Sequence, residues 1–356
     1  MSLKTTNEID IVRANSSKIN DVDFDNLSFG SVFTDHMLVC DFKEGQWGKP
    51  VIKPYEPFMI DPSAKVFHYG QAIFEGMKAY KDDNNDVWLF RPDENYIRFN
   101  KSAVRMAMPE VPENVFIDGL KTILEIDQEW VKKGLGNTLY IRPFMIAIGS
   151  GVIAQPSTQY RFMIILSPAK SYYSGEVKVI IAEHYSRAAN GGIGAAKAAG
   201  NYSAQFYPQK LAQEKGFQQI IWTDDATHTK LEEAGTMNLM FMVGSSLVTA
   251  PTGDTILDGV TRKSVIQIAK DWGIDVQERQ LSVKELVNGI LDGSVTEAFG
   301  AGTAAVIAPI QIIGFDGKDY QLPDKKESDF SSKVFTEINQ IRLGEIEDTR
   351  GWVWKV

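Results

Sequence analysis

Apolar positions in the first half of the chain alternate between short runs and amphipathic stretches, a pattern that predicts a mixed α/β arrangement. Residues 87–90 and 139–148 read as strands. Between them, Pro92 opens a helix that runs to about Met108, and residues 115–131 predict a second helix. The apolar residues of that second helix recur close to helical spacing at Phe116, Leu120, Ile123, Leu124 and Ile126.

The second half alternates strands with helices and begins after a segment rich in turn-forming residues. Residues 168–176 carry Pro, Gly and Ser between two strand-like runs, so we predict an interdomain linker there. It separates a smaller N-terminal domain, 1–167, from a larger C-terminal domain, 177–356. Downstream elements are expected at 219–223, 238–243, a helix after Thr261, 276–279, 283–290 and 331–343.

Charge and composition narrow the class of protein. The chain has 356 residues, is 44% hydrophobic and carries a net charge of −9 from acids and bases scattered along it, so we expect neither a nucleic-acid nor a membrane partner. The single cysteine, Cys40, excludes an intramolecular disulfide. The N-terminus lacks the apolar core of a signal peptide, and no apolar run approaches the roughly 18 to 20 residues of a membrane span, so we expect a cytoplasmic protein. No metal site is expected, because the four histidines show no ligand spacing: His36, His68, His184 and His228.

The most unusual local sequence, residues 188–202 (AANGGIGAAKAAGNY), places Lys197 among small residues. A flat ring can lie close against such a backbone, and a surround of low charge favours the neutral amine that imine formation needs. A surface loop with a solvated lysine is the alternative that these residues alone leave open. The segment also approaches a dinucleotide-binding glycine pattern but has Lys197 at the third position.

Two further segments contain groups that can bind an anion. In 257–262 (LDGVTR), Gly259 and Thr261 open a predicted helix, where backbone N–H groups and a hydroxyl suit a phosphate, although a simple helix cap explains the same residues. Residues 297–305 (EAFGAGTAA) form a glycine-rich turn with a hydroxyl, which is a weak signal alone. Upstream of both lies the segment 231–238 (LEEAGTMN).

Together these segments resemble the fold-type IV pyridoxal-phosphate (PLP) enzymes, and among them the branched-chain amino-acid aminotransferases. The resemblance implies a mixed α/β (α+β) fold with a smaller N-terminal domain and a larger PLP domain. It spans nearly the whole chain in the same order, through 29–37, 68–80, 89–92, 140–143, 200–202, 233–238, 259–262, 299–303 and 351–354.

The resemblance implies a role for each matching residue around PLP. Lys197 matches the lysine that holds the cofactor as a Schiff base, Tyr202 the tyrosine bonded to its ring oxygen, and Glu233 the carboxylate facing the pyridine nitrogen. Glu232 is adjacent, and the spacing to residues 235–238 selects Glu233. The residues matching the phosphate cradle are Arg98, Thr261 and Thr303, with the backbone of Val260.

A substrate pocket follows from the same resemblance. Its apolar wall matches Phe29, Tyr69, Phe74, Tyr140 and Tyr172, although plain core packing remains open for Phe29 and Tyr172. The α-carboxylate is expected at backbone N–H groups near Thr236, Met237 and Ala304. The second carboxylate of 2-oxoglutarate would meet Arg142, with Tyr69 and Tyr140.

The implied activity is ping-pong transamination between leucine, isoleucine or valine and 2-oxoglutarate, in a homodimer whose pocket takes the residue matching Tyr69 from the neighbouring subunit. A D-amino-acid aminotransferase and an aminodeoxychorismate lyase share the fold and stay open as alternatives. A non-catalytic metabolite-binding relative would have lost the lysine or its partners, which this sequence retains. Two departures from the family touch regulation and packing: Ala305 and Ala308 stand where some members have a redox Cys-x-x-Cys, and Met240 stands where an aromatic residue is common.

Overall fold

The computed structural model describes residues 8–170, 177–235, 237–304 and 306–356. Within these residues, no helix combines the length and the apolar character that crossing a membrane requires. The chain forms two compact units that are discontinuous in sequence. The first unit comprises Met1–Ser171, Ala196–Gly200 and Asn339–Val356, and the second comprises Tyr172–Ala195 and Asn201–Ile338.

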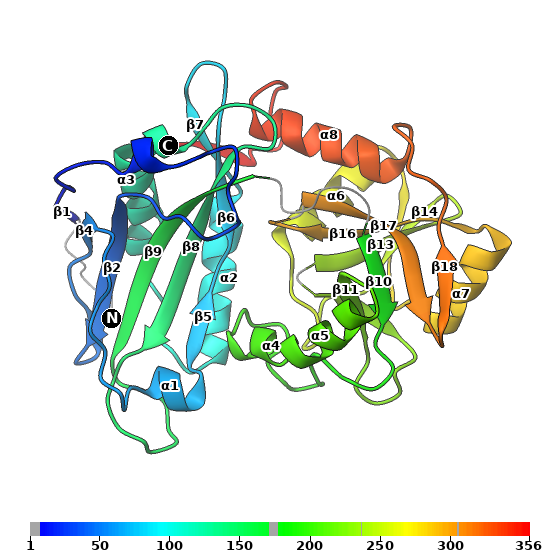
Figure 1. Ribbon diagram of the computed structural model, residues 1–356, viewed down its shortest axis with the longest axis horizontal. Coiled ribbons are helices and arrows are strands. Elements are labelled where there is room, and N and C mark those ends of the chain that lie inside the picture. Colours follow the sequence, from blue (N-terminus) through cyan, green and yellow to red (C-terminus); the bar gives the residue numbers. More distant parts are fainter. Residues whose placement is uncertain (1–7, 171–176, 236, 305) are drawn as a thin grey trace. The chain divides into compact units, whose positions relative to one another are not determined.

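The first unit is built on a ten-stranded, mostly antiparallel sheet (Figure 1). Its strands follow the order β1 (Asp10–Ile11), β4 (Val51–Pro54), β2 (His36–Lys43), β9 (Tyr160–Ala169), β8 (Thr138–Ala147), β6 (Met77–Lys81), β7 (Val87–Phe90) and β19 (Val353–Lys355). Two short strands lie off this path: β3 (Gln46–Trp47) pairs with β2, and β5 (Ala72–Phe74) pairs with β8. The C-terminal strand β19 thus completes a sheet that the N-terminal residues begin.

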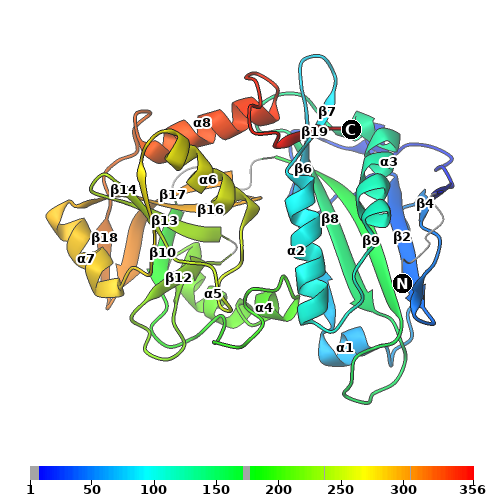
Figure 2. The ribbon, with the colours of Figure 1, turned by 180° about the vertical axis from the view of Figure 1, so that it is seen from behind.

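Helices α2 (Pro92–Arg105) and α3 (Gly119–Ile126) cover one face of this sheet (Figure 2). The rings of Phe99 on α2, Phe116 in the turn that precedes α3 and Phe162 on β9 pack together at that face, with centroids 5.5 to 5.6 Å apart. Inward-facing strand residues such as Leu89 and Leu139 belong to the same apolar core. Because strand side chains alternate between faces, the polar residues between them lie on the other face. The unit also holds α1 (Lys65–Tyr69) and three short turns, η1 (Ile19–Asp21), η2 (Asn114–Asp118) and η3 (Gln128–Trp130).

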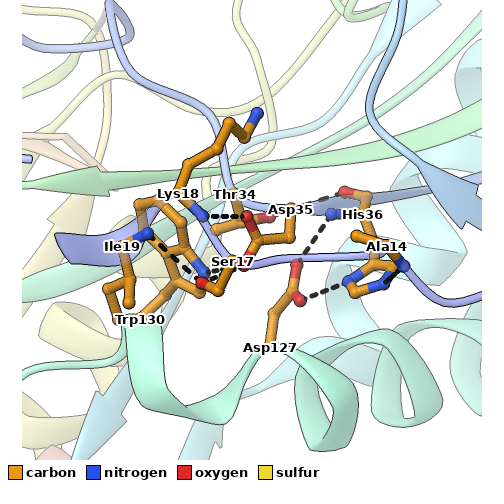
Figure 3. A network of polar contacts seen from close by, with 9 residues as sticks. All are labelled: Ala14, Ser17, Lys18, Ile19, Thr34, Asp35, His36, Asp127 and Trp130. Carbon is orange, nitrogen blue, oxygen red and sulfur yellow. Dashed lines mark hydrogen bonds and ion pairs between the residues drawn. The ribbon is translucent and has the colours of Figure 1, made fainter. Parts of the chain in front are cut away.

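A polar network fastens the N-terminal segment of the first unit to its core (Figure 3). His36 Nδ1 lies 2.6 Å from Asp127 Oδ1, while His36 Nε2 accepts a hydrogen bond from the backbone N–H of Ala14 at 2.9 Å. The accepting Nε2 fixes the proton on Nδ1, which donates to Asp127. Asp35 accepts from the indole of Trp130 and the backbone N–H of Lys18, and these bonds hold its pKa below the ordinary value although burial alone would raise it.

The second unit contains a closed ring of six strands. Its sheet follows the order β12 (Leu231–Ala234), β11 (Gln219–Thr223), β10 (Val177–Ile181), β17 (Val306–Phe315), β16 (Val295–Gly302) and β13 (Met237–Val243), then β14 (Ser246–Thr249) and β15 (Asp275–Glu278). Because β12 also pairs with β13, the first six strands close on themselves. The remaining elements are β18 (Lys318–Gln321), α4 (Gly200–Ser203), α5 (Phe206–Glu214), α6 (Val260–Asp271), α7 (Val283–Asp292) and α8 (Phe330–Arg342). Helix α8 starts in this unit and ends in the first.

The predicted mixed α/β fold is confirmed, and two local predictions need correction. The single helix expected at 115–131 is wrong: a π-turn, helix α3 and a 3-10 turn succeed one another there. The break falls at Asp127, whose carboxylate is committed to His36. The linker predicted at 168–176 begins too early, because Pro168 and Ala169 still pair with β8; residues 171–176 lie outside the described residues.

Candidate functional site

Lys197 is held from both sides within the first unit. Its backbone N–H donates to Ser102 Oγ at 2.9 Å, and its carbonyl oxygen accepts from the N–H of Phe74 at 3.0 Å. The next residue, Ala198, forms a bridge with Ile73 of β5. The half-buried side chain places Nζ 4.7 Å from the centre of the Phe74 ring. The lysine is thus fixed against strand β5 and helix α2 at its backbone.

Arg98 lies one helical turn before Ser102 on α2 and forms a buried ion pair with Glu75. The distances are 2.7 Å from Nε to Oε1 and 2.9 Å from Nη2 to Oε2, and Asn95 Nδ2 adds a third bond at 2.8 Å. Burial alone would raise the pKa of Glu75, but the charge and hydrogen bonds of Arg98, with a contribution from Lys197, hold it below the ordinary value. Glu75 therefore stays ionised and orients the guanidinium of Arg98.

Four of the predicted substrate residues form a continuous group in the first unit. The Arg142 guanidinium lies over the Phe74 ring, 4.5 Å from its centre, and Arg142 Nη2 donates to Tyr140 Oη at 2.9 Å. Phe29 packs edge-on against Tyr140 with ring centres 4.8 Å apart. Tyr140 lies so close to Gly76 that any side chain there would collide with its phenol.

Tyr69 is not part of that group. It is the last residue of α1, it is exposed, and its hydroxyl donates to the carbonyl oxygen of Val152. Within one chain, Tyr69 therefore lies apart from the group that contains Phe74 and Tyr140. Two other predicted residues, Tyr172 and Thr236, lie outside the described residues.

In the second unit, donors from three separate segments hold Glu233. Arg187 Nη2 lies 3.0 Å from Oε1, and Oε2 accepts from the backbone N–H of Leu257 at 3.0 Å and from Asn238 Nδ2 at 3.2 Å. Both Glu233 and Arg187 are buried. Arg187 also donates to the carbonyl oxygens of Gly194 and Thr255, so it joins three segments. Sequence reasoning missed Arg187, because no local pattern marks an arginine that acts on a distant strand.

The start of α6 presents donors next to this carboxylate. Gly259 is the N-cap, and a Cβ there would collide with Asn238 Oδ1, which in turn neighbours Glu233. Val260 and Thr261 open the helix, so their N–H groups have no partner inside it. The Thr261 hydroxyl makes no hydrogen bond within the described part of the chain. A phosphate fits this set of donors and the positive end of the helix dipole.

A family model supplies the deciding comparison: amino-transferase class IV matches residues 72–313. The chain belongs to the class IV aminotransferase family.

The relatives of this aminotransferase match it over nearly its whole length. Branched-chain-amino-acid transaminase 1 of Bacillus subtilis (strain 168) is 42% identical over 336 residues, which is 93% of this chain and 94% of that relative. Among solved structures, a branched-chain aminotransferase from Thermoproteus uzoniensis with norvaline has a TM-score of 0.73 at 26% identity, covering 90% of this chain and 99% of the other. The branched-chain amino acid aminotransferase from Thermobaculum terrenum in its PLP-form has a TM-score of 0.72 at 18% identity, covering 89% and 97%, and shows the fold alone.

The two adjacent acids of this aminotransferase have different partners. Glu233 faces Arg187, whereas Glu232 Oε1 accepts from Thr255 Oγ1 at 2.6 Å and Glu232 Oε2 is buried without a hydrogen bond in the described structure. Burial raises the pKa of Glu232, and Glu233 adds to that shift. Of the two acids, Glu233 is the one that forms an ion pair with Arg187.

The remaining candidates of the aminotransferase lie on helix α4 and at the ends of strands β13 and β16. Tyr202 lies on α4, where the neighbouring Asn201 donates to the carbonyl oxygen of Ile193 at 2.8 Å. Thr303 and Ala304 follow the end of β16. Met237 opens β13, and its thioether lies so close to Gly300 that a larger residue there would displace it.

Proposed function

We propose that this class IV aminotransferase moves the amino group between branched-chain L-amino acids and 2-oxoglutarate, with PLP bound to Lys197. The observation that carries the proposal is the Lys197 amine 4.7 Å from the centre of the Phe74 ring, with the Arg142 guanidinium 4.5 Å from the same centre. A nucleophile, an apolar wall and a fixed cation are the groups that a transaminase needs for these two substrates. The branched-chain activity named for the Bacillus subtilis relative supports the choice of substrate.

PLP, when bound, supplies a protonated ring that accepts electrons from the substrate Cα. Lys197 holds the cofactor, and its amine moves the α-proton once it is free. Glu233 would hold the ring nitrogen in its protonated form, and Arg187 keeps that carboxylate in place. The Tyr202 phenol is assigned to the ring oxygen. The phosphate is assigned to Arg98, Val260, Thr261 and Thr303.

Both substrates use the same apolar wall in this proposal. Phe29, Phe74 and Tyr140 receive the branched side chain, and each buried methylene contributes about 0.8 kcal/mol. Arg142 receives the distal carboxylate of 2-oxoglutarate, because its guanidinium is already oriented by Tyr140 Oη at 2.9 Å. The α-carboxylate is assigned to backbone N–H groups near Thr236, Met237 and Ala304.

We further propose a homodimer in the cytoplasm, with a small N-terminal domain at 1–167 and a larger PLP domain at 177–356. The exposed position of Tyr69 supports the dimer, since a residue at the surface of α1 can serve a neighbouring subunit. Tyr172 is assigned to the same pocket. Sedimentation of the active enzyme tests the assembly: a fully active monomer contradicts it.

Initial rates with leucine and 2-oxoglutarate, measured by the glutamate formed, test the proposed function. We expect parallel double-reciprocal lines, since the first product leaves before the second substrate binds. Arg142→Met should raise KM for 2-oxoglutarate and leave the half-reaction with leucine close to the wild-type rate. Tyr140→Phe, which keeps the ring and removes the hydroxyl, should raise the same KM by less. Turnover of D-alanine or of aminodeoxychorismate without turnover of leucine would replace the proposal by another activity of the fold.

A further inference from the structure

Arg342, the last residue of α8, is a buried cation that forms no ion pair with an acidic residue among the described residues of the first unit. Its guanidinium lies 4.3 Å from the centre of the Phe90 ring and 5.3 Å from that of Tyr80, and the residue is 3% exposed. Nε and Nη1 are buried and make no hydrogen bond within the described residues. Burial lowers the pKa of Arg342, and within the described structure Tyr80 is the group that opposes this shift. Buried charges ordinarily have a partner of opposite sign, so this arginine calls for one.

A second cation lies on the same sheet face. Lys78 and Tyr80 are two residues apart on β6 and therefore point to one side, and Phe90 lies on that side of β7 because Trp88 pairs with Tyr80. Lys78 is 5% exposed, and burial, together with the charge of Arg342, lowers its pKa to about 7. The charge of Arg342 thus disfavours the protonated form of Lys78 on this face.

The carboxylate that directly follows β6, that of Asp82, is already occupied. Asp82, four residues after Lys78 on the same face, accepts from the Trp88 indole at 2.9 Å and from the backbone N–H groups of Asn84 and Asp86. Arg342 appears in none of the ion pairs among the described residues. A carboxylate is the group that a planar guanidinium binds best, because its two oxygens accept two parallel hydrogen bonds.

This position is distinct from that of Arg142. Lys78 pairs with Tyr140 across the antiparallel strands β6 and β8. Arg142 lies two residues beyond Tyr140 on β8, and Tyr80 lies two residues beyond Lys78 on β6. Because the strands are antiparallel, Arg142 and Tyr80 lie in opposite directions from this pair. The rows of Arg142 and Tyr80 are therefore separated by about four residues of strand, or roughly 13 Å. Ser167, opposite Tyr140 on β9, adds a buried hydroxyl without a hydrogen bond in the described structure.

We propose that Arg342 and Lys78, with the Tyr80 hydroxyl, form a second carboxylate-binding site on this sheet face. The carboxylate either comes from a free small carboxylate ion or is the distal group of a dicarboxylic substrate. Only the second source rests on the proposed transaminase function. In either case the anion supplies the negative charge that the described residues around Arg342 lack.

Thermal unfolding of the holoenzyme at constant ionic strength tests the site, with acetate, glutarate and 4-methylpentanoate as probes. We expect glutarate to raise the midpoint of the wild-type protein by mass action. Arg342→Met should weaken the apparent glutarate affinity about tenfold or more, since hydrogen bonds to a charged group are lost. Lys284→Met, which removes one exposed charge on α7, is the matched control and should bind as the wild type does. If Arg342→Met does not fold, Arg342→Lys keeps the charge without the planar fork and should still bind more weakly.

The source of the carboxylate follows from two comparisons. A free ion predicts similar binding of acetate and glutarate and an unchanged KM for 2-oxoglutarate in Arg342→Met. A substrate carboxylate predicts that glutarate binds better than acetate, and that KM rises for 2-oxoglutarate and not for 4-methyl-2-oxopentanoate. The proposed site is refuted if the Arg342 variants bind glutarate and acetate with the same affinities as the wild-type protein. The transaminase proposal fails separately, if the wild-type enzyme does not turn over leucine.

Discussion

Replacing Glu75 with glutamine removes the charge that faces Arg98 inside the first unit and keeps the size of the side chain. The Glu75 carboxylate is fully buried and accepts from Arg98 at 2.7 and 2.9 Å, from Asn95 at 2.8 Å and from the N–H of Gly76 at 3.1 Å. Breaking a buried pair on one side costs about 3–5 kcal/mol, because the other charge is left uncompensated. At about 2–4 °C per kcal/mol for a domain of this size, the unfolding midpoint should fall by roughly 6–20 °C.

The stabilisation from the pair of Glu75 and Arg98 depends on pH. The folded-state pKa of Glu75 is lowered from its ordinary value of 4.5, so its stabilisation is present above that value and is lost as the pH falls through the lowered pKa. The wild-type protein should therefore lose this part of its stability in acid. Glu75→Gln should lack that part of the pH dependence.

Asp41→Asn is the matched control for this experiment. Asp41 also forms a two-point pair with an arginine, Arg161, at 2.6 and 2.9 Å, but both side chains are more than a fifth exposed. Solvent screening limits the stabilisation that such a pair contributes to about 0–1 kcal/mol. Urea unfolding of both variants, from neutral pH to acid well below pH 4.5, gives the comparison, because the stabilisation from Glu75 is lost only below that value. If Glu75→Gln destabilises no more than Asp41→Asn, the buried pair does not stabilise Arg98 as described.

Three further changes test other parts of the molecule. Arg187→Met removes the buried cation that faces Glu233, so PLP affinity should drop about tenfold in a fluorescence titration, and unchanged affinity would separate Arg187 from the site. Burial lowers the pKa of Lys78 in the folded protein to about 7, so the free energy of unfolding should rise as the pH increases from about 7 to 10. Lys78→Met should reduce this dependence of stability on pH, and an unchanged dependence would contradict the lowered pKa. Asp127→Asn leaves one acceptor oxygen for the two N–H groups of His36 that Asp127 binds, and it should destabilise the protein by about 1–3 kcal/mol in urea. Residues 14–18 should then exchange their amide hydrogens faster, and protection equal to the wild type would refute the anchoring role.

The sequence predicted those helices and strands that depend only on residues close together in the chain. The strand at 87–90 and the helix from Pro92 follow from apolar patterning and from the fixed φ of proline, and the structure has β7 and α2 at these places. Lys197 stood out because small residues surround it. These features need no knowledge of distant residues.

Contacts between distant segments could not be predicted in the same way. The bond between His36 and Asp127 joins residues 91 positions apart and interrupts a pattern that otherwise reads as one helix. The pairing of β19 with β7 and the closure of the ring between β12 and β13 depend on the whole sheet. Arg187 and Arg342 carry no motif, and their importance appears only where burial leaves them beside Glu233 and Tyr80.

The central claim is that Lys197 binds PLP and that leucine and 2-oxoglutarate drive the two halves of the reaction. The most direct test records the visible absorption band of bound PLP after adding leucine and then 2-oxoglutarate, for the wild type, Lys197→Ala and the exposed-lysine control Lys284→Ala. The account predicts that leucine removes the band and 2-oxoglutarate restores it in the wild type and in Lys284→Ala, while Lys197→Ala does not cycle. A band that leucine leaves unchanged in the wild type, or a full cycle in Lys197→Ala, would contradict it.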